Sequence, residues 1–164
     1  IDTKYSSRWE RFKLIKKEYY MDDHSIFYAY SKNNEEPLVG LPDDLYENNK
    51  EVFLAYIDYY NRQLVPQINS QINQASGQPI FLFGAHGFSQ YLIEFGLNID
   101  NIVCLLDNDI NKQGKRLYGT DLEVGSPALL KNYKAPIVIL KAGAYDTEIK
   151  NDIIQNINPD VIFW

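Results

Sequence analysis

From residue 79 onward the chain alternates short apolar runs with amphipathic segments, and this alternation restricts the fold more than any other feature. The runs Ile80–Phe83, Ile102–Leu106 and Ile137–Leu140 contain no polar residue. Strands this apolar are typical of a parallel sheet that is covered on both faces. Between and after them, helices are expected over Phe88–Phe95 and from Asp146, as the capping residue, to about Ile154.

Shorter elements complete this predicted unit. Leu122–Val124 and Val161–Phe163 are expected to be short strands, and Ser126-Pro127 should begin a helix that runs through Leu130. Right-handed crossovers between parallel strands then give the strand order 3-2-1-4-5. The predicted fold class is therefore α/β, with a Rossmann-like parallel sheet flanked by helices and preceded by an N-terminal segment.

The N-terminal segment has a different character, charged and aromatic. Ser6-Ser7 followed by Arg8–Ile15 predicts a capped helix, and the aromatic run Ile26–Tyr30 predicts a strand. We expect residues 1–42 to form an appendage of helix and strand. The tail of an upstream domain is an alternative interpretation of the same segment.

A long helix is expected to lead into the α/β unit. Pro42 suits its first turn, and Val52 and Leu64 fall near helical spacing on one face. Pro66 should kink or end this helix, because proline lacks an N–H and its ring crowds the preceding turn. Residues 43–164 are therefore predicted to form a Rossmann-like domain with a long leading helix.

Composition excludes several classes of function. The net charge of −6 and the isoelectric point of about 4.9 argue against binding of a nucleic-acid backbone by bulk electrostatics. No apolar stretch is long enough to cross a membrane and no signal peptide is visible, so a cytoplasmic protein without a membrane partner is expected. The single cysteine, Cys104, lies in an apolar run and is expected to be an inert buried thiol.

The turn Gly84-Ala85-His86-Gly87 joins a predicted strand to a predicted helix. Small residues at such a turn allow the backbone to approach a ligand, and the amides of Gly87, Phe88 and Ser89 would face a phosphate or carboxylate. The dinucleotide fingerprint requires three glycines, whereas the last slot here falls at about Gln90. A tight turn without a ligand is the alternative interpretation.

Asp107 ends the second predicted strand, about twenty residues after the turn. An acidic residue at this place receives ribose hydroxyls in dinucleotide-binding folds. Asp107 with Asn108 and Asp109 would equally begin a turn through local bonds to the backbone. Both roles remain open for Asp107, and they are compatible.

Three further features lie near the expected cleft. His86 is a candidate base, phosphate donor or polar group facing a pyrimidine, and no second ligand stands at a metal-binding spacing from it. Lys112 belongs to a basic cluster with Lys115 and Arg116, which forms either a solvated loop or a diphosphate clamp. Tyr145, after Gly143, either clamps a sugar or base or belongs to a plain turn.

Four stretches form an ordered set of motifs: Phe81-Leu82-Phe83-Gly84-Ala85-His86-Gly87, Asp107-Asn108-Asp109 with Asn111-Lys112-Gln113-Gly114, Gly119-Thr120, and Ser126-Pro127. This set resembles the C-terminal domain of SAM-dependent sugar C-methyltransferases, which act on nucleotide-linked deoxysugars. The resemblance covers roughly residues 45–164. It departs from that family at Phe88 and Ser89, where the family turn has a lysine and a further small residue.

The resemblance implies a domain that holds a TDP- or UDP-linked sugar for chemistry performed elsewhere in polysaccharide biosynthesis. It implies no cofactor for this domain, and SAM for an upstream methyltransferase domain or partner chain. The chain itself contains no SAM motif of the form D/E-x-G-x-G-x-G. The pattern is also similar to nucleotide-sugar-binding domains of bacterial sugar acyltransferases and to sugar-nucleotide dehydratases. An NAD-type enzyme domain, a non-catalytic interaction module and a homodimer remain alternatives.

Overall fold

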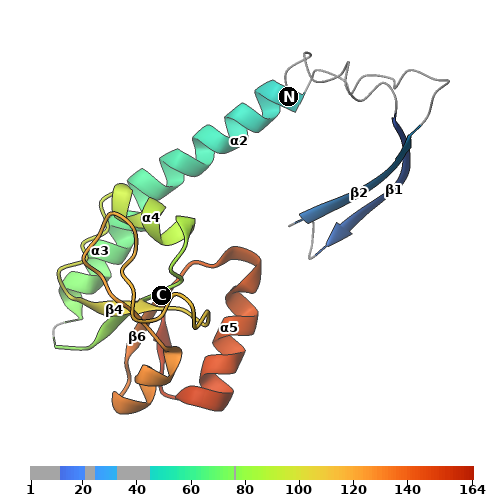
Figure 1. Ribbon diagram of the computed structural model, residues 1–164. Coiled ribbons are helices and arrows are strands. Elements are labelled where there is room, and N and C mark those ends of the chain that lie inside the picture. Colours follow the sequence, from blue (N-terminus) through green and yellow to red (C-terminus); the bar gives the residue numbers. More distant parts are fainter. Residues whose placement is uncertain (1–11, 21–24, 33–44, 76) are drawn as a thin grey trace. The chain divides into compact units, whose positions relative to one another are not determined.

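A computed structural model describes residues 12–20, 25–32, 45–75 and 77–164 (Figure 1). The chain divides into two compact units, residues 1–51 and 52–164. The first unit contains an antiparallel hairpin of β1 (Phe12–Tyr20) and β2 (Ser25–Lys32) and the beginning of helix α2 (Leu45–Tyr59). The second contains the α/β sheet and the helices that cover it.

The hairpin contradicts the predicted helix over Arg8–Ile15 wherever that segment is described. Residues 12–15 belong to β1, whose Tyr19 pairs with Ile26 of β2, while residues 6–11 lie outside the described residues. The aromatic and β-branched residues of both segments favour cross-strand pairing, and this pairing overrides a local helical spacing. The predicted strand Ile26–Tyr30 is confirmed within β2.

The long leading helix does not end at Pro66. Helix α2 passes into a π-helical turn, η2 (Tyr60–Leu64), and continues as α3 (Val65–Gln74), with Pro66 in the first turn of α3. In η2 the N–H of Val65 donates to the carbonyl of Tyr60, five residues back. A wider turn suits the start of α3, because proline needs no acceptor there and its ring crowds an ordinary helical turn.

Only the second half of this long helix is buried. Tyr60, Leu64, Ile68 and Ile72 have less than a tenth of their surface exposed, whereas Val52 is 62% exposed. Both residues are helical, as predicted, but Leu64 is buried and Val52 is not. Helical spacing identifies a face, but the extent of the neighbouring sheet decides how far along the helix that face is covered.

The second unit is built on five parallel strands, and the predicted strand order is confirmed. The observed order is β5-β4-β3-β6-β7, which is 3-2-1-4-5 within the sheet. The strands are β3 (Ile80–Phe83), β4 (Ile102–Leu106), β5 (Val124–Gly125), β6 (Ile137–Leu140) and β7 (Ile162–Phe163). The protein is thus an α/β protein with a Rossmann-like sheet.

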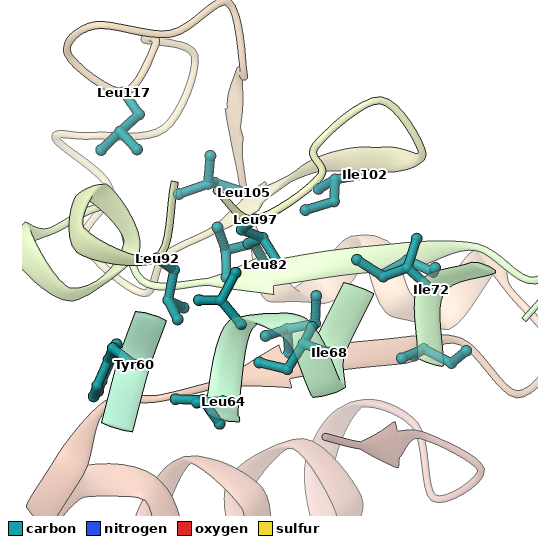
Figure 2. Packing of buried hydrophobic residues seen from close by; sticks show 14 of the residues in the cluster. Tyr60, Leu64, Ile68, Ile72, Leu82, Leu92, Leu97, Ile102, Leu105 and Leu117 are labelled. Carbon is teal, nitrogen blue, oxygen red and sulfur yellow. The ribbon is translucent and has the colours of Figure 1, made fainter. Parts of the chain in front are cut away.

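Helices cover both faces of the sheet, as its apolar strands require. Helices α3 and α4 (Gly87–Glu94) pack on one face of the sheet (Figure 1). The other face is covered by the 3₁₀ helix η3 (Pro127–Asn132) and by α5 (Asp146–Asp152), and α5 continues as the π-helical turn η5 (Ile153–Ile157) (Figure 1). Side chains of β3 alternate between two cores, since Leu82 joins the α3–α4 side and Phe81 the opposite side. Figure 2 shows Leu82 and Leu105 gathered with the side chains of α3 and α4 in the first of these cores.

Shorter elements differ in detail from their predicted positions. The third strand of the sheet begins at Val124 rather than Leu122, since Leu122 donates its N–H to the Thr120 hydroxyl and accepts from the Leu117 N–H within a preceding turn. The helix after Ser126 is a 3₁₀ helix, and the Ser126 hydroxyl accepts from the N–H of Ala128 as its cap. Within the described residues no helix is long and apolar enough to cross a membrane.

A pair of substitutions on β4 tests this layered core. Leu105→Ala should lower the free energy of unfolding by about 2–5 kcal/mol, because Leu105 is fully buried and its truncation leaves a cavity. Val103→Ala, on the same strand but 50% exposed, should lower it by less than about 1 kcal/mol. Urea unfolding of both variants measures the difference, and equal losses would contradict the assigned burial.

Candidate functional site

The two central strands β3 and β6 define the place where a site is expected. The chain leaves β3 toward α4 on one face of the sheet and leaves β6 toward α5 on the other (Figure 1). In open parallel sheets, ligands bind outside the carboxyl ends of the strands at such a switch point. The loops that follow β3, β4 and β6 therefore contain the residues to examine.

The loop after β3 turns sharply at Gly84. Gly84 has φ +100°, and its N–H donates to the carbonyl of Leu106 on the neighbouring strand at 2.7 Å. The N–H of His86 then donates back to the Gly84 carbonyl at 2.9 Å. Only glycine adopts this backbone conformation without strain, so the turn depends on Gly84.

The imidazole of His86 folds back over this turn. A Cβ atom at Gly84 would collide with Nε2 of His86, so the ring occupies the space beside the glycine. His86 is also the N-cap of α4, and its Nδ1 accepts a hydrogen bond from the Phe88 N–H at 3.2 Å. The Phe88 amide, predicted to face a ligand, is therefore already bonded.

The hydrogen bond from Phe88 also defines the protonation state of His86. Nδ1 accepts, so the neutral ring carries its proton on Nε2. Burial lowers the pKa of His86, the nearby Lys112 ammonium lowers it further, and the Asp107 carboxylate opposes them only in part. At neutral pH His86 is consequently a hydrogen-bond donor through Nε2 and not a cation.

The carboxylate of Asp107 joins the loops after β3 and β4. Its Oδ2 accepts from the Ala85 N–H at 2.7 Å and from the Lys112 ammonium at 3.0 Å, and its Oδ1 accepts from the Asp109 N–H at 2.9 Å. Burial alone would raise the pKa of Asp107, but these bonds outweigh burial and lower it. A carboxylate offers about four acceptor positions, so about one remains for a ligand hydroxyl.

Of the two sequence-based interpretations of Asp107, the hydrogen bonds test the local turn, and the ribose contact stays a prediction. The bond to the Asp109 N–H is the local turn that the sequence suggested, while the bond to Ala85 crosses between strands and was not anticipated. Gln113 adds another unanticipated link, since its side-chain amide donates to the Asp107 carbonyl at 2.9 Å. Asn108 lies exposed between these groups.

Lys112 is the basic residue of its cluster that reaches the turn. Its ammonium is paired with Asp107, and 39% of its side chain is exposed. Arg116 instead pairs with Asp121 at 2.9 Å. The arrangement of Arg116 matches the solvated-loop interpretation, and the charge of Lys112 is largely balanced before any ligand arrives.

Ser89 locks the first turn of α4 onto the loop. Ser89 is buried, and its hydroxyl donates to the Gly84 carbonyl at 2.5 Å. Counted from Gly84, the third glycine of the fingerprint corresponds to Ser89 and not to Gln90, and the buried Ser89 hydroxyl lies where the helix approaches the strand closely. The side chain of Gln90 instead donates to the Tyr118 carbonyl at 3.3 Å.

The beginning of α4 keeps two unused donors. The N–H groups of Gly87 and Ser89 have no acceptor within the described part of the chain, but Gly87 is exposed whereas Ser89 is buried, so the Gly87 N–H is the accessible donor. The first N–H groups of a helix carry the positive end of its dipole and commonly bind anions. Phe88, 40% exposed, lies next to them with its ring 5.6 Å from that of His86.

The loop after β6 is also closed by a carboxylate of the chain. Ala142 (φ −102°) and Gly143 (φ +62°) adopt the paired conformation that can turn successive N–H groups toward an anion. Oδ1 of Asp146 accepts from the Ala142 N–H at 2.5 Å. The prediction that Asp146 caps its own helix is therefore wrong, because this carboxylate bonds back to the loop and Tyr145 holds the N-cap position.

The structure thus brings most of the predicted residues into one bonded group. The hydrogen bonds given above link Gly84, Ala85, His86, Phe88, Ser89, Asp107 and Lys112, and Gly87 lies in the same turn. Tyr145 lies on the neighbouring loop, in the 3₁₀ helix η4 (Gly143–Tyr145), and is 39% exposed. Sequence analysis missed Lys141, the residue that directly follows β6. A lysine at the end of an apolar run was the available signal.

Comparisons with known proteins add no family to this description of a Rossmann-like α/β protein. No protein-family model matches the chain, and no curated protein matches it either. The residues that the structure describes contain no cluster of three His, Cys, Asp or Glu side chains able to hold a metal ion. Functional inference therefore depends on the chemistry of the site itself.

Two glycine substitutions test the geometry of the turn. Gly84→Ala should lower the free energy of unfolding by at least about 1–2 kcal/mol, because alanine is strained at φ +100° and its Cβ would meet the His86 ring. Gly87→Ala should not destabilise the protein, since a Cβ there meets no atom within 4 Å. Urea unfolding compares them, and equal tolerance of both would contradict the described turn.

A second test concerns Asp107 and its pH dependence. Asp107→Asn should lower the free energy of unfolding by about 1–3 kcal/mol at pH 7, because a buried carboxylate with three donors is lost. Since the folded pKa is depressed, this contribution is complete above the unfolded pKa of about 3.9 and is lost as the pH falls through the folded value.

The difference between wild type and Asp107→Asn should accordingly shrink when urea unfolding is repeated at increasingly acidic pH. Asp121→Asn is the control, because Asp121 is almost fully exposed and pairs only with Arg116 at the surface. A difference for Asp107→Asn that stays constant down to pH 2 would contradict the role given to its charge.

Proposed function

We propose that the α/β unit binds a nucleotide sugar at the carboxyl edge of its sheet, as the substrate-holding C-terminal domain of a SAM-dependent methyltransferase-like protein in bacterial sugar or polysaccharide biosynthesis. The domain itself binds no cofactor in this proposal, and SAM belongs to an upstream domain or partner chain. The observation that carries the proposal is the exposed N–H of Gly87, which has no acceptor within the described part of the chain, at the start of α4 beside the switch point.

The surrounding groups match the parts of such a ligand. A phosphate accepts hydrogen bonds from the amides at a helix N-terminus without requiring a basic field, which suits a chain with a net charge of −6. Asp107 retains about one acceptor position for a hydroxyl, and His86 presents an Nε2–H donor. Phe88 offers an exposed aromatic ring against which a sugar or base can pack.

The geometry disfavours the NAD-type alternative. In dinucleotide folds the second glycine lets the pyrophosphate approach the backbone, and here that position is His86. Its ring lies over Gly84, in the space that a crossing pyrophosphate would need. A ligand bound at the exposed N–H of Gly87, to one side of this ring, avoids the conflict.

The link to methyltransferases rests on the motif set that runs from Phe81 to Pro127. The site supplies hydrogen-bond donors, one acceptor position and an aromatic ring, and these groups are suited to holding a substrate. The sequence contains no SAM motif. Methyl transfer is therefore assigned in this proposal to residues outside the α/β unit.

A partner surface for the methyltransferase domain is proposed on α2. Val52, Phe53 and Leu54 each expose more than half of their surface. Because consecutive residues of a helix point in different directions, these apolar side chains lie exposed on more than one side of α2, where a partner could cover them. The same observation favours the interaction-module alternative, in which this surface and not the cleft is functional. Loss of ligand binding with retained partner binding would distinguish the two.

Removal of a single N–H tests the proposed phosphate contact. Gly87→Pro deletes the amide donor at the first helical position, where proline is well tolerated and where a Cβ meets no atom within 4 Å. Loss of one hydrogen bond to a charged phosphate should weaken binding of UDP- or TDP-sugars about tenfold or more. Isothermal titration calorimetry and ligand-induced shifts in melting temperature measure the effect.

Gly87→Ala is the matched control, because it adds a side chain at the same position and keeps the N–H. It should retain nearly the wild-type affinity. Absence of binding by the wild type at millimolar nucleotide sugar would overturn the proposed function, and equal affinity of Gly87→Pro and Gly87→Ala would exclude the amide contact.

A further inference from the structure

The hairpin of β1 and β2 is too small to be a complete sheet. It contains two strands, and no third strand among the described residues pairs with either of them. A two-stranded hairpin alone is at best marginally stable in water, and independent stability requires more strands or a covered apolar face. Tyr19, Tyr20, Phe27 and Tyr28 each leave at least 45% of their surface exposed. The hairpin by itself therefore lacks both a further strand and cover for its aromatic side chains.

The outer edge of β1 is protected against pairing with another chain. β1 contains Lys13, Lys16 and Lys17. Its pairing with β2 is interrupted by a bulge between Leu14 and Lys16. Lysines and bulges are common protections of edge strands, because a charge resists burial and a bulge bends the strand away from a regular partner.

The outer edge of β2 has none of these protections. From Ser25 to Ser31 the strand contains no charged residue, no proline and no glycine, and its one charge is Lys32 at the end. Phe27 and Tyr28 belong to the residue types that strands favour. An edge strand that is uncharged and aromatic is a template for pairing with a further strand. β2 is therefore the edge at which the hairpin can be extended.

The other sheet of the chain offers no strand that matches β2. Its edge strands, β5 and β7, have two residues each, whereas β2 has eight. A second copy of β2 matches in length, in composition and in its lack of charge. Pairing of β2 with β2 also leaves the two lysine-rich β1 strands at the outer edges, where their like charges are farthest apart. Charge thus favours association through β2 over association through β1.

We propose that the chain forms a homodimer in which β2 pairs antiparallel with β2 of a second copy, so that two hairpins make one sheet of order β1-β2-β2-β1. The arrangement is a closed two-fold dimer, the commonest symmetry among homo-oligomers. Because the two-fold axis is perpendicular to the sheet, Tyr28 of both copies lies on the same face. Cross-strand aromatic pairs on that face stabilise the sheet. The inference goes beyond the proposed ligand, since the hairpin and the five-stranded sheet belong to different compact units.

The mass of the protein in solution is the first measurement. Sedimentation equilibrium of the whole chain should give twice the 19.1 kDa of one copy. Ala29→Glu should raise the dimer dissociation constant about tenfold or more, because like charges then meet near the two-fold axis. The hairpin itself should be retained, since residue 29 faces Lys16 of β1, which has the opposite charge. Ala29→Thr is the matched control and should stay dimeric, because threonine is uncharged and favours strands.

A mixture of charge variants separates lost pairing from lost folding. Ala29→Glu and Ala29→Lys should each be monomeric alone, and an equimolar mixture should form a heterodimer, because opposite charges then meet across the axis. A variant that is monomeric because its hairpin no longer folds is not rescued by mixing. Failure of the mixture to dimerise would contradict pairing through β2.

Disulfide crosslinking tests the antiparallel register. Cys104 is the only cysteine and is buried, so Cys104→Ala provides a background for single cysteines in β2. In an antiparallel two-fold pair, only the residue on the axis lies opposite its own copy, with Cα atoms about 4.5–5.5 Å apart, which a disulfide spans. Among Phe27→Cys, Tyr28→Cys, Ala29→Cys and Tyr30→Cys, crosslinking should therefore peak at one position and fall on both sides.

The other outcomes overturn the inference. A wild type that is monomeric at the highest concentration tested excludes the homodimer, and a dimer that Ala29→Glu leaves intact uses a different surface. Equal crosslinking at all four cysteine positions excludes an antiparallel pair with a single axis. A monomer that binds an added extended peptide along β2 assigns this edge to a partner protein and likewise excludes self-pairing.

Discussion

Asp107 is the residue on which the geometry of the site depends. Its carboxylate ends β4, accepts the Ala85 N–H from the loop after β3, and holds Lys112 through an ion pair. Without this acceptor, the N–H of Ala85 would be left unpaired beside a buried strand, at a cost comparable to a lost hydrogen bond. The Gly84 turn, the position of the His86 ring and the start of α4 all follow from a loop held in this way.

Carboxylates of the chain satisfy one amide on each side of the switch point. Asp107 accepts from Ala85 after β3, and Asp146 accepts from Ala142 after β6. These contacts define which groups remain for a ligand, because a donor already paired inside the protein gains little from a second partner. Among the residues that the structure describes, the exposed N–H of Gly87 and the ammonium of Lys141 have no partner, and they follow β3 and β6 respectively.

Local interactions made most of the fold predictable. Apolar runs without alternation identified β3, β4 and β6, and right-handed crossovers then gave their order. The predicted helix before Tyr20 failed because that segment pairs with β2 instead, and no spacing within the segment records this pairing. The π-helical turn before Pro66 is by contrast a local effect of the proline, which changes the helix there without ending it.

The sequence by itself determined the strand order, the turn at Gly84 and the set of residues around it, because apolar patterning and glycine requirements are local. Only the tertiary structure decided what those residues do. It showed that Asp107 bonds across strands, that the Ser89 hydroxyl donates to the Gly84 carbonyl, and that Lys141 follows β6 beside Gly84 without a partner in the described chain. Hydrogen bonds and charge pairs between loops depend on distances that the order of residues does not contain.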